Sequence, residues 1–336
     1  MRAPVAAALM LMVSAAPVAA RAEPVPYLQK PRVSFRTLPY VADPHPLNPY
    51  IHYVGAYEMT ATGTSEFMGL SDIQVFPAGD HLNVEAISDW GAGVVFELRP
   101  QGDGYADSSL EIDPLRGADG QTFGDKAMGD SEDIAYDPAT MDRYVSFEGH
   151  QRIMKYPAAT AWRGRGETLP VSGLPVFPDN FGMEGLTYIR DKAEGDNLLV
   201  GVESGGFWDC DLKAYDCIRV EGPPVPGFLY MMTSLAVLDY ASATTDHQIL
   251  GLYRYYDPIT GPRNILSLLR LEGDRAHGFR LVRVGDLLKV APPMPYDNYE
   301  GVAAVKIDGG YRLYLICDRI HDEGKPKILV YDWKQP

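Results

Sequence analysis

The stretch Glu300-Gly-Val-Ala303 opens an apolar run, and it has two close counterparts in Glu132-Asp-Ile-Ala135 and Glu184-Gly-Leu-Thr187. Thr233-Ser-Leu-Ala236 keeps the pattern without the acid, and Ser71-Asp-Ile-Gln74 fits it more loosely. The aliphatic residues stand at positions 73, 134, 186, 235 and 302, so the intervals between them are 61, 52, 49 and 67 residues. A pattern that recurs at intervals of roughly 50 residues indicates a repeat architecture.

Each repeat contains a series of strand-like runs separated by turns. The recurrent pattern opens a first strand, and a second strand with polar residues near its end follows it. We expect these second strands at residues 82–89, 143–148, 197–203, 248–254 and 311–318. Third strands follow at residues 94–98, 152–156, 264–271 and 327–333, and a weaker fourth often comes next, as at 279–284. Four strands for each repeat of this length are typical of a β-propeller.

The repeats predict an all-β propeller with five blades. Six blades are the alternative, because the intervals of 61 and 67 residues are generous. The last repeat holds only three strands, and the N-terminal run Tyr53–Thr60 can supply the missing one. Pairing the N-terminal strand with the C-terminal blade would close the ring and remove an exposed sheet edge. A β-sandwich array with coincidental spacing is the competing interpretation, which the repeated match of pattern and strand pair disfavours.

The composition excludes some partners. The 336 residues include 30 Lys and Arg against 45 Asp and Glu, a formal net charge of -15. Nucleic acids and anionic membranes are polyanions that call for a basic surface, so neither is an expected partner. We expect a small-molecule substrate or ligand and a monomeric protein.

The N-terminus has the pattern of a signal peptide. Arg2 precedes an apolar stretch without charge, and Ala20-Arg-Ala22 has the small-x-small form that a signal peptidase reads. We expect cleavage before Glu23; a retained membrane anchor is the alternative. The predicted organisation is a signal peptide at 1–22, an N-terminal extension at 23–49 and the propeller at 50–336, in a periplasmic or secreted protein.

The three cysteines fit an oxidising compartment. Cys210 and Cys217 lie in one short polar segment and predict a local disulfide. Half of a zinc site is the alternative, although two further ligands at suitable spacing are lacking. Cys317 lies in the apolar run 311–317 and predicts a buried strand thiol.

Several phrases resemble those of the phytase-like family, also called "esterase-like activity of phytase". They are Asp297–Ile307 with the strands at 310–318 and 328–333, Asn180–Thr187, and Gly69–Ile73. The resemblance covers roughly residues 50–336. It implies an exported bacterial protein with a propeller fold, and it does not define a reaction. Ser71-Asp72 and Thr233-Ser234 depart from the Glu-Gly that stands in the family's repeats.

Acidic residues recur at equivalent places in the predicted repeats. Asp72, Glu132, Glu184 and Glu300 stand at the strand openings, and Asp89, Glu148, Glu203 and Asp318 stand near the ends of the second strands. Carboxylates that converge on a central channel repel one another unless a cation, a hydrogen bond or a proton intervenes. Hard oxygen ligands in this number favour a divalent cation, and we expect calcium.

Basic residues follow the same strands. Arg254 and Arg319, and also Arg152, could hold the oxygens of a phosphate, and His150 or His321 could move a proton. The alternative is structural: each Glu would accept hydrogen bonds from backbone N–H groups between neighbouring blades, and each Arg would pair with the adjacent carboxylates.

The sequence therefore supports two functions. The first is a metal-assisted hydrolase of a phosphate ester or another ester, in which Glu132, Glu184 and Glu300 hold the cation or orient water and Arg254 and Arg319 bind the anionic group. The second is a non-catalytic periplasmic binding module for a cation or a small ligand. A serine esterase of the α/β-hydrolase type is unsupported, because the chain has no G-x-S-x-G sequence.

Overall fold

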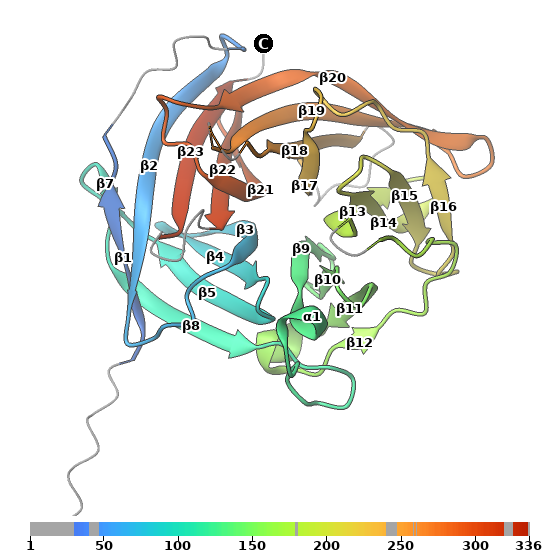
Figure 1. Ribbon diagram of the computed structural model, residues 1–336, viewed down its shortest axis with the longest axis horizontal. Coiled ribbons are helices and arrows are strands. Elements are labelled where there is room, and N and C mark those ends of the chain that lie inside the picture. The colour runs from blue at the N-terminus through green and yellow to red at the C-terminus, as the bar shows by residue number, and fades with distance from the viewer. Residues whose placement is uncertain are drawn as a thin grey trace, which may run out of the picture.

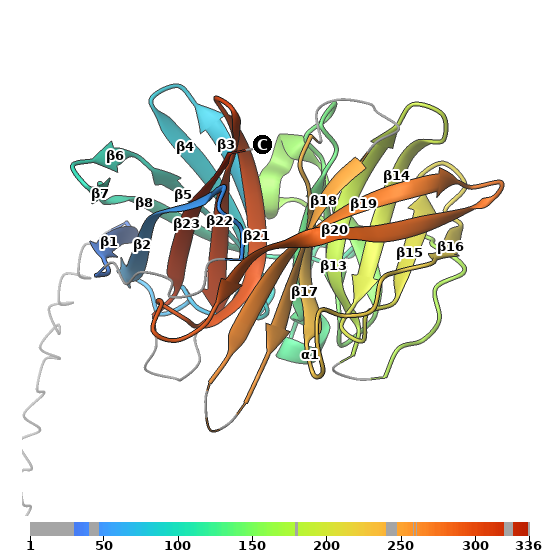
Figure 2. The same cartoon turned by 90° about the horizontal axis from the view of Figure 1, so that it is seen from above.

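The computed structural model describes residues 30–39, 47–178, 181–239, 247–257, 259, 261–318 and 325–334. It is almost entirely β-structure, and its sheets are arranged around a common centre (Figure 1). Seen from above, the sheets fan out on both sides of that centre (Figure 2). This is the arrangement of a β-propeller. The predicted signal peptide at 1–22 lies outside the described residues, as does much of the extension at 23–49.

Three sheets have four antiparallel strands each, which run in chain order from the innermost strand outward. The first contains β9 (Ser131–Tyr136), β10 (Arg143–Phe147), β11 (Arg152–Tyr156) and β12 (Glu167–Thr168). The second contains β13 (Met183–Asp191), β14 (Gly195–Val202), β15 (Phe207–Asp211) and β16 (Cys217–Val220). The third contains β17 (Met231–Val237), β18 (His247–Tyr255), β19 (Arg263–Asp274) and β20 (Gly278–Val290).

A nine-stranded sheet includes both the N-terminal and the C-terminal strands. One half contains β3 (Leu70–Ala78), β4 (His81–Ser88), β5 (Ala92–Leu98) and β8 (Ser108–Pro114). The other contains β21 (Asn298–Ile307), β22 (Gly310–Asp318), β23 (Lys327–Lys334) and β2 (Ile51–Thr62). β2 pairs antiparallel with β23. Between the halves lies β1 (Arg32–Thr37), which pairs with β2 on one side and with β8 on the other and has no counterpart among the predicted strands.

The remaining elements are short. They are the hairpin of β6 (Pro100–Gln101) and β7 (Gly104–Tyr105), the helix α1 (Lys126–Gly129) and a 3-10 helix (Ala158–Arg163). The sequence patterns predicted neither helix. In the part of the chain that the structure describes, no helix has the length and apolar character needed to cross a membrane.

The innermost strands β3, β9, β13, β17 and β21 begin at the recurrent sequence pattern, as the repeats predict. Each contacts the next one along the chain, and β21 contacts β3. β9 is buried along its whole length, because sheets pack against both of its faces. Apolar side chains fill the space between neighbouring sheets; Leu250 and Leu252 of β18, for example, share one cluster with Leu313 and Leu315 of β22.

The cysteines are placed as predicted. Cys210 and Cys217 form a disulfide between paired residues of β15 and β16. Because both sulfur atoms are used in this bond, neither is available as a zinc ligand. Cys317 is a free thiol, fully buried on β22.

We expect the stability of the fold to depend on pH through Asp209 of β15, which lies away from the central channel. Its side chain is fully buried, and burial raises its pKa to about 7, although Nη2 of Arg275 lies 3.4 Å from its Oδ1. The unfolded chain releases this proton near pH 3.9, so the free energy of unfolding falls as the pH rises toward the folded pKa. We expect a loss of about 2 kcal/mol from roughly pH 5 to pH 7.

Urea unfolding at a series of pH values measures this loss. The Asn side chain of the variant Asp209→Asn cannot ionise, so the loss of stability between pH 5 and pH 7 that comes from this residue should be absent. The pH dependence that comes from other groups should remain. Parallel stability curves for the two proteins would show that Asp209 is ionised throughout.

Candidate functional site

All five innermost strands carry a β-bulge or a related irregularity close to the place where they begin to pair with the second strand. The register shifts by one residue between Leu70 and Asp72 in β3, and the same shift occurs in β13, β17 and β21, while in β9 it falls between the paired residues Ser131 and Ile134. A bulge inserts one extra residue and re-aims its side chain. The bulged residues are Ser71, Glu132, Glu184, Thr233 and Glu300. Three predicted acidic residues are therefore structurally equivalent.

Asp72 is not equivalent to these glutamates, and this part of the sequence prediction is wrong. It occupies the position after the bulge, together with Asp133, Gly185, Ser234 and Gly301. A Cβ atom on Gly301 would lie 2.5 Å from Cα of Asp72, and one on Gly185 would lie 2.8 Å from Cγ of Leu235. The glycine of the Glu-Gly phrase is thus needed because the inner strands approach each other closely.

Asp72 and Asp133 form a buried carboxyl pair at the axis. Both side chains are fully buried and hydrogen-bonded to each other, and burial raises the pKa of Asp72 to about 6 and that of Asp133 well above its usual value. Oδ2 of Asp133 accepts hydrogen bonds from the backbone N–H of Leu186 at 2.7 Å and of Leu235 at 3.0 Å. The sequence alternative assigned such backbone bonds to the glutamates; the structure places them on the aspartates instead.

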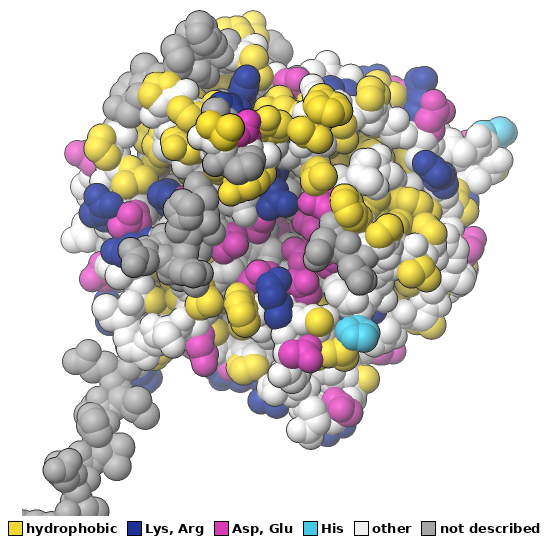
Figure 3. All heavy atoms as spheres, viewed as in Figure 1, with side chains coloured by type: hydrophobic (Ala, Val, Ile, Leu, Met, Phe, Trp, Pro, Cys, Tyr) yellow, Lys and Arg dark blue, Asp and Glu magenta, His cyan; other side chains and the backbone are white. Residues whose placement is uncertain are grey.

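The ends of the second strands supply another set of equivalent residues. On the second strands, the residues next to the pair that precedes each bulge are Asp89, Glu148, Glu203, Arg254 and Asp318. The backbone N–H of Glu148 donates to the carbonyl of Asp130, and that of Glu203 donates to the carbonyl of Gly182. These bonds fix each strand end beside the loop that leads into its own inner strand. In the space-filling view, acidic side chains gather in the hollow at the centre of this face (Figure 3).

Arg254 is the cation among these strand ends. Its Nη1 donates to Oε1 of Glu300 at 2.6 Å, and its Nη2 donates to Oε1 of Glu203 at 3.2 Å. Burial raises the pKa of Glu300 to about 8, even though Arg254 acts in the opposite direction. The guanidinium of Arg254, on β18, therefore links the sheet that contains β14 to the sheet that contains β21. It offsets only part of the negative charge of Glu203 and Glu300.

Two functional candidates were missed in the sequence. Lys126 is the first residue of α1 and Asp130 directly follows its last, and Nζ of Lys126 lies 2.5 Å from Oδ1 of Asp130 and 3.1 Å from Oδ2 of Asp89. Burial raises the pKa of Asp89 to about 6, and Lys126 opposes this shift. Asp130 stands two residues before Glu132, and this acid-x-acid spacing is the sequence signal that could have identified Asp130 as a candidate. Lys126 belongs to no repeat, so no pattern pointed to it.

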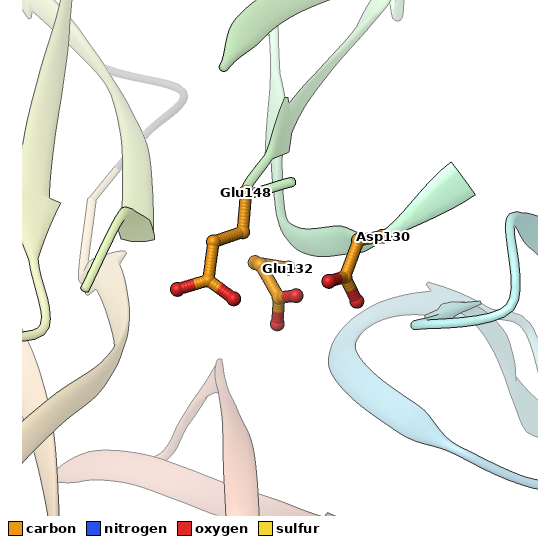
Figure 4. Close-up of side chains that lie close together, drawn as sticks. All are labelled: Asp130, Glu132 and Glu148. Carbon is orange, nitrogen blue, oxygen red and sulfur yellow. The ribbon is translucent and has the colours of Figure 1, made fainter. Parts of the chain in front are cut away.

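The carboxylates form two overlapping groups. In one group, ligand oxygens of Asp130, Glu132 and Glu148 all lie within 4.8 Å of one another, and Figure 4 shows these three side chains converging. In the other, the same limit holds for Glu148, Glu184 and Glu203. Burial, together with the neighbouring carboxylates, raises the pKa of Glu132 and of Glu184 well above the usual value.

We call the acidic mouth the end of the channel formed by eight carboxylates and two cationic side chains. Its members are Asp89, Asp130, Glu132, Glu148, Glu184, Glu203, Glu300 and Asp318, with Lys126 and Arg254. Within the described residues its formal charge is -6. Carboxylate oxygens in this arrangement are suited to calcium or another hard divalent cation.

Four further residues were predicted near this site. Arg319 and His321 lie outside the described residues. The guanidinium of Arg152 lies 4.0 Å from the ring centre of Phe147 and donates to the carbonyl of His150. His150 itself is exposed.

One family model matches more than half of the chain. The model of the Phytase-like family, described as "Esterase-like activity of phytase", matches residues 65–319. No curated protein matches the chain significantly.

Similar solved structures include three carbohydrate-active enzymes. An exo-1,5-alpha-L-arabinanase from a bovine ruminal metagenomic library has 11% identity and a TM-score of 0.45, and the match covers 79% of this chain and 93% of that one. A thermostable family-43 glycoside hydrolase has 9% identity and a TM-score of 0.48, with 80% and 90% covered. An engineered GH43 glycoside hydrolase with endo-xylanase and exo-arabinofuranosidase activity has 12% identity and a TM-score of 0.46, with 80% and 51% covered.

Proposed function

Since the chain belongs to the Phytase-like family, we propose that it is a metal-assisted ester hydrolase, with a phosphate ester as the substrate class, that acts at the acidic mouth. One observation carries the proposal: the seven carboxylates of the acidic mouth other than Asp318 face only Lys126 and Arg254 as cationic side chains in the described part of the chain. An anionic ester would be repelled from this site unless a cation were bound first. A bound divalent cation would neutralise the ester and polarise a water molecule.

The protein side chains have distinct tasks in this proposal. Glu132, Glu184 and Glu300 hold the cation or orient the attacking water, because the bulges direct these three residues to equivalent places. Arg254 binds an anionic oxygen of the substrate from the position where it now contacts Glu203 and Glu300. Arg319, which follows the strand end at Asp318, is the second proposed anion ligand.

We also propose that the ring has five blades. The nine-stranded sheet would then represent two blades joined by β1, with β2 as the outer strand of the last blade. We propose further that the protein is exported and acts as a monomer. Export is supported by the signal-peptide pattern at 1–22 and by the Cys210–Cys217 disulfide, which forms in oxidising compartments.

The variant Glu184→Gln tests the hydrolase. Protein stripped with a chelator should be inactive on p-nitrophenyl phosphate, and calcium or magnesium should restore turnover. Glu184→Gln keeps the size of the side chain but removes its charge, so we expect a loss of roughly 100-fold or more in kcat/KM, the scale of a lost group that stabilises charge in the transition state.

The matched control is Glu167→Gln, which changes an exposed glutamate on the outer strand β12 and should keep wild-type activity. Equal activity in the two variants would contradict the proposed role of the acidic mouth. Absence of hydrolysis across phosphate and carboxylate esters, with every divalent metal tried, would reject the hydrolase.

A second function is favoured by the way the two cations are engaged. Lys126 contacts Asp89 and Asp130, and Arg254 contacts Glu203 and Glu300, so both already serve carboxylates of the acidic mouth. A non-catalytic module that binds a cation or a cationic ligand needs no further group for an anion. Tight calcium binding by a protein that hydrolyses no ester would select this function.

A further inference from the structure

We propose that the acidic mouth holds two cations side by side, with Glu148 as a ligand shared by both. One cation lies among Asp130, Glu132 and Glu148, and the other lies among Glu148, Glu184 and Glu203. This inference rests on the proposed function, because it specifies the metal centre on which that function depends.

The spacing of the ligand oxygens fits such a centre. In both groups the oxygens lie within 4.8 Å of one another. Calcium binds oxygen at about 2.3–2.6 Å, so two ligands on opposite sides of one ion are separated by up to about 5 Å. Each group is therefore already the size of a coordination shell, with positions left for water or a substrate oxygen.

Glu148 is placed to serve both cations. It is the residue that the two groups have in common, and it extends from the end of β10. Its Oε1 accepts a hydrogen bond from the backbone N–H of Gly182 at 2.9 Å, which fixes the orientation of the carboxylate. Each carboxylate oxygen has two lone pairs, so this bond leaves capacity for a metal on both oxygens. Metal ions that act together on one phosphate ester lie about 3.5–4 Å apart.

Two unpartnered side chains provide the independent evidence that something binds here. Glu132 is 8% exposed and Glu184 is 9% exposed. Neither carboxylate has a hydrogen bond or an ion pair with any residue that the structure describes, although one of their oxygens lies in each group. A buried carboxylate without a partner is strongly unfavourable. There is one such carboxylate in each group, which is the pattern that two cations would satisfy.

The protein's own cations leave these two residues unpaired. Lys126 contacts Asp130 of the first group, and Arg254 contacts Glu203 of the second, without an ion pair from either cation to Glu132 or Glu184 among the described residues. The formal charge of -6 at the acidic mouth falls to -4 with one divalent cation and to -2 with two. Binding of the second cation therefore removes more of the repulsion that an anionic ester would meet.

Equilibrium dialysis of the chelator-stripped protein against radioactive calcium tests the pair. We expect two calcium ions for each wild-type chain and for Glu167→Gln. Glu132→Gln and Glu184→Gln should each bind one ion, because each substitution removes a ligand of only one group. Glu148→Gln should weaken both sites by roughly tenfold or more, because it removes charge from both.

Manganese gives a second readout that does not depend on the Glu148 variant being folded. Two manganese ions that share a carboxylate should give an exchange-coupled electron paramagnetic resonance spectrum in the wild type, and a single-ion spectrum in Glu132→Gln and Glu184→Gln. A stoichiometry of one in the wild type, with an uncoupled spectrum, would overturn the pair while leaving a one-metal hydrolase intact. No binding of either metal would reject both the pair and the proposed function.

Discussion

Replacement of Asp133 by alanine is expected to lower the free energy of unfolding by about 4 kcal/mol, because the buried N–H groups of Leu186 and Leu235 lose their acceptor at once, while that of Ile134 keeps Oδ2 of Asp72. Oδ1 of Asp133 accepts the N–H of Ile134, and Oδ2 accepts those of Leu186 and Leu235. These three residues lie on β9, β13 and β17, so one carboxyl group connects three of the inner strands. Urea unfolding at neutral pH, followed by circular dichroism, measures the loss.

Two further variants give this prediction its controls. Asp133→Asn keeps one carbonyl oxygen that can accept from Leu186 and Leu235, so it should cost less than Asp133→Ala. Asp107→Ala removes an exposed carboxylate from a loop and should change stability by no more than about 0.5 kcal/mol. If Asp133→Ala were as stable as Asp107→Ala, the inner strands would not depend on this acceptor.

Replacement of Arg254 by methionine should destabilise the metal-free protein by about 3 kcal/mol, the scale of a broken buried ion pair. Glu203 and Glu300 would lose their shared cation. The pKa of Glu300 is already raised to about 8 by burial, and it would rise further without Arg254. Glu300 stays largely protonated in both folded proteins below pH 8, so its share of the defect should be constant there and should grow as the pH rises above about 8.

Calcium should reverse much of this defect, since a cation that binds only the folded protein stabilises it by mass action. Thermal unfolding in chelator and in millimolar calcium gives the comparison. The matched control is Arg163→Met: Arg163 also contacts two carboxylates, Glu111 and Asp113, but it lies on the surface. Its loss should cost less than about 1 kcal/mol and should not respond to calcium. If Arg254→Met were no less stable than this control and did not respond to calcium, the carboxylates of the acidic mouth would not depend on Arg254 for stability.

The repeat pattern predicted where the inner strands begin and where the second strands end. The glutamates at 132, 184 and 300 were assigned to equivalent places because the same four-residue phrase surrounds each of them. The residues Asp89, Glu148, Glu203, Arg254 and Asp318 could be found because each lies at or near the end of the second strand that follows the phrase. Both sets depend on local periodicity, which a single sequence contains.

The wrong placement of Asp72 has a specific physical cause. The bulge adds one residue to the inner strand, and a shift of one residue turns a side chain to the other face of a strand. Ser71 stands at the bulge and Asp72 stands one position deeper, where it pairs with Asp133. Lys126 and Asp130 were missed for a different reason: the loop around α1 occurs once, so no repeat identified it.

The strand β1 makes the segment before the propeller a structural part of it. Arg32 and Val33 face Ser109 and Ser108 of β8, while the same strand pairs along its length with β2. Without these residues the nine-stranded sheet would separate into two, and β2 would present an uncovered row of backbone donors and acceptors to other molecules. Bare strand edges recruit further chains. A proteolytic cut that released β1 would therefore convert a self-contained molecule into one prone to associate with its own copies.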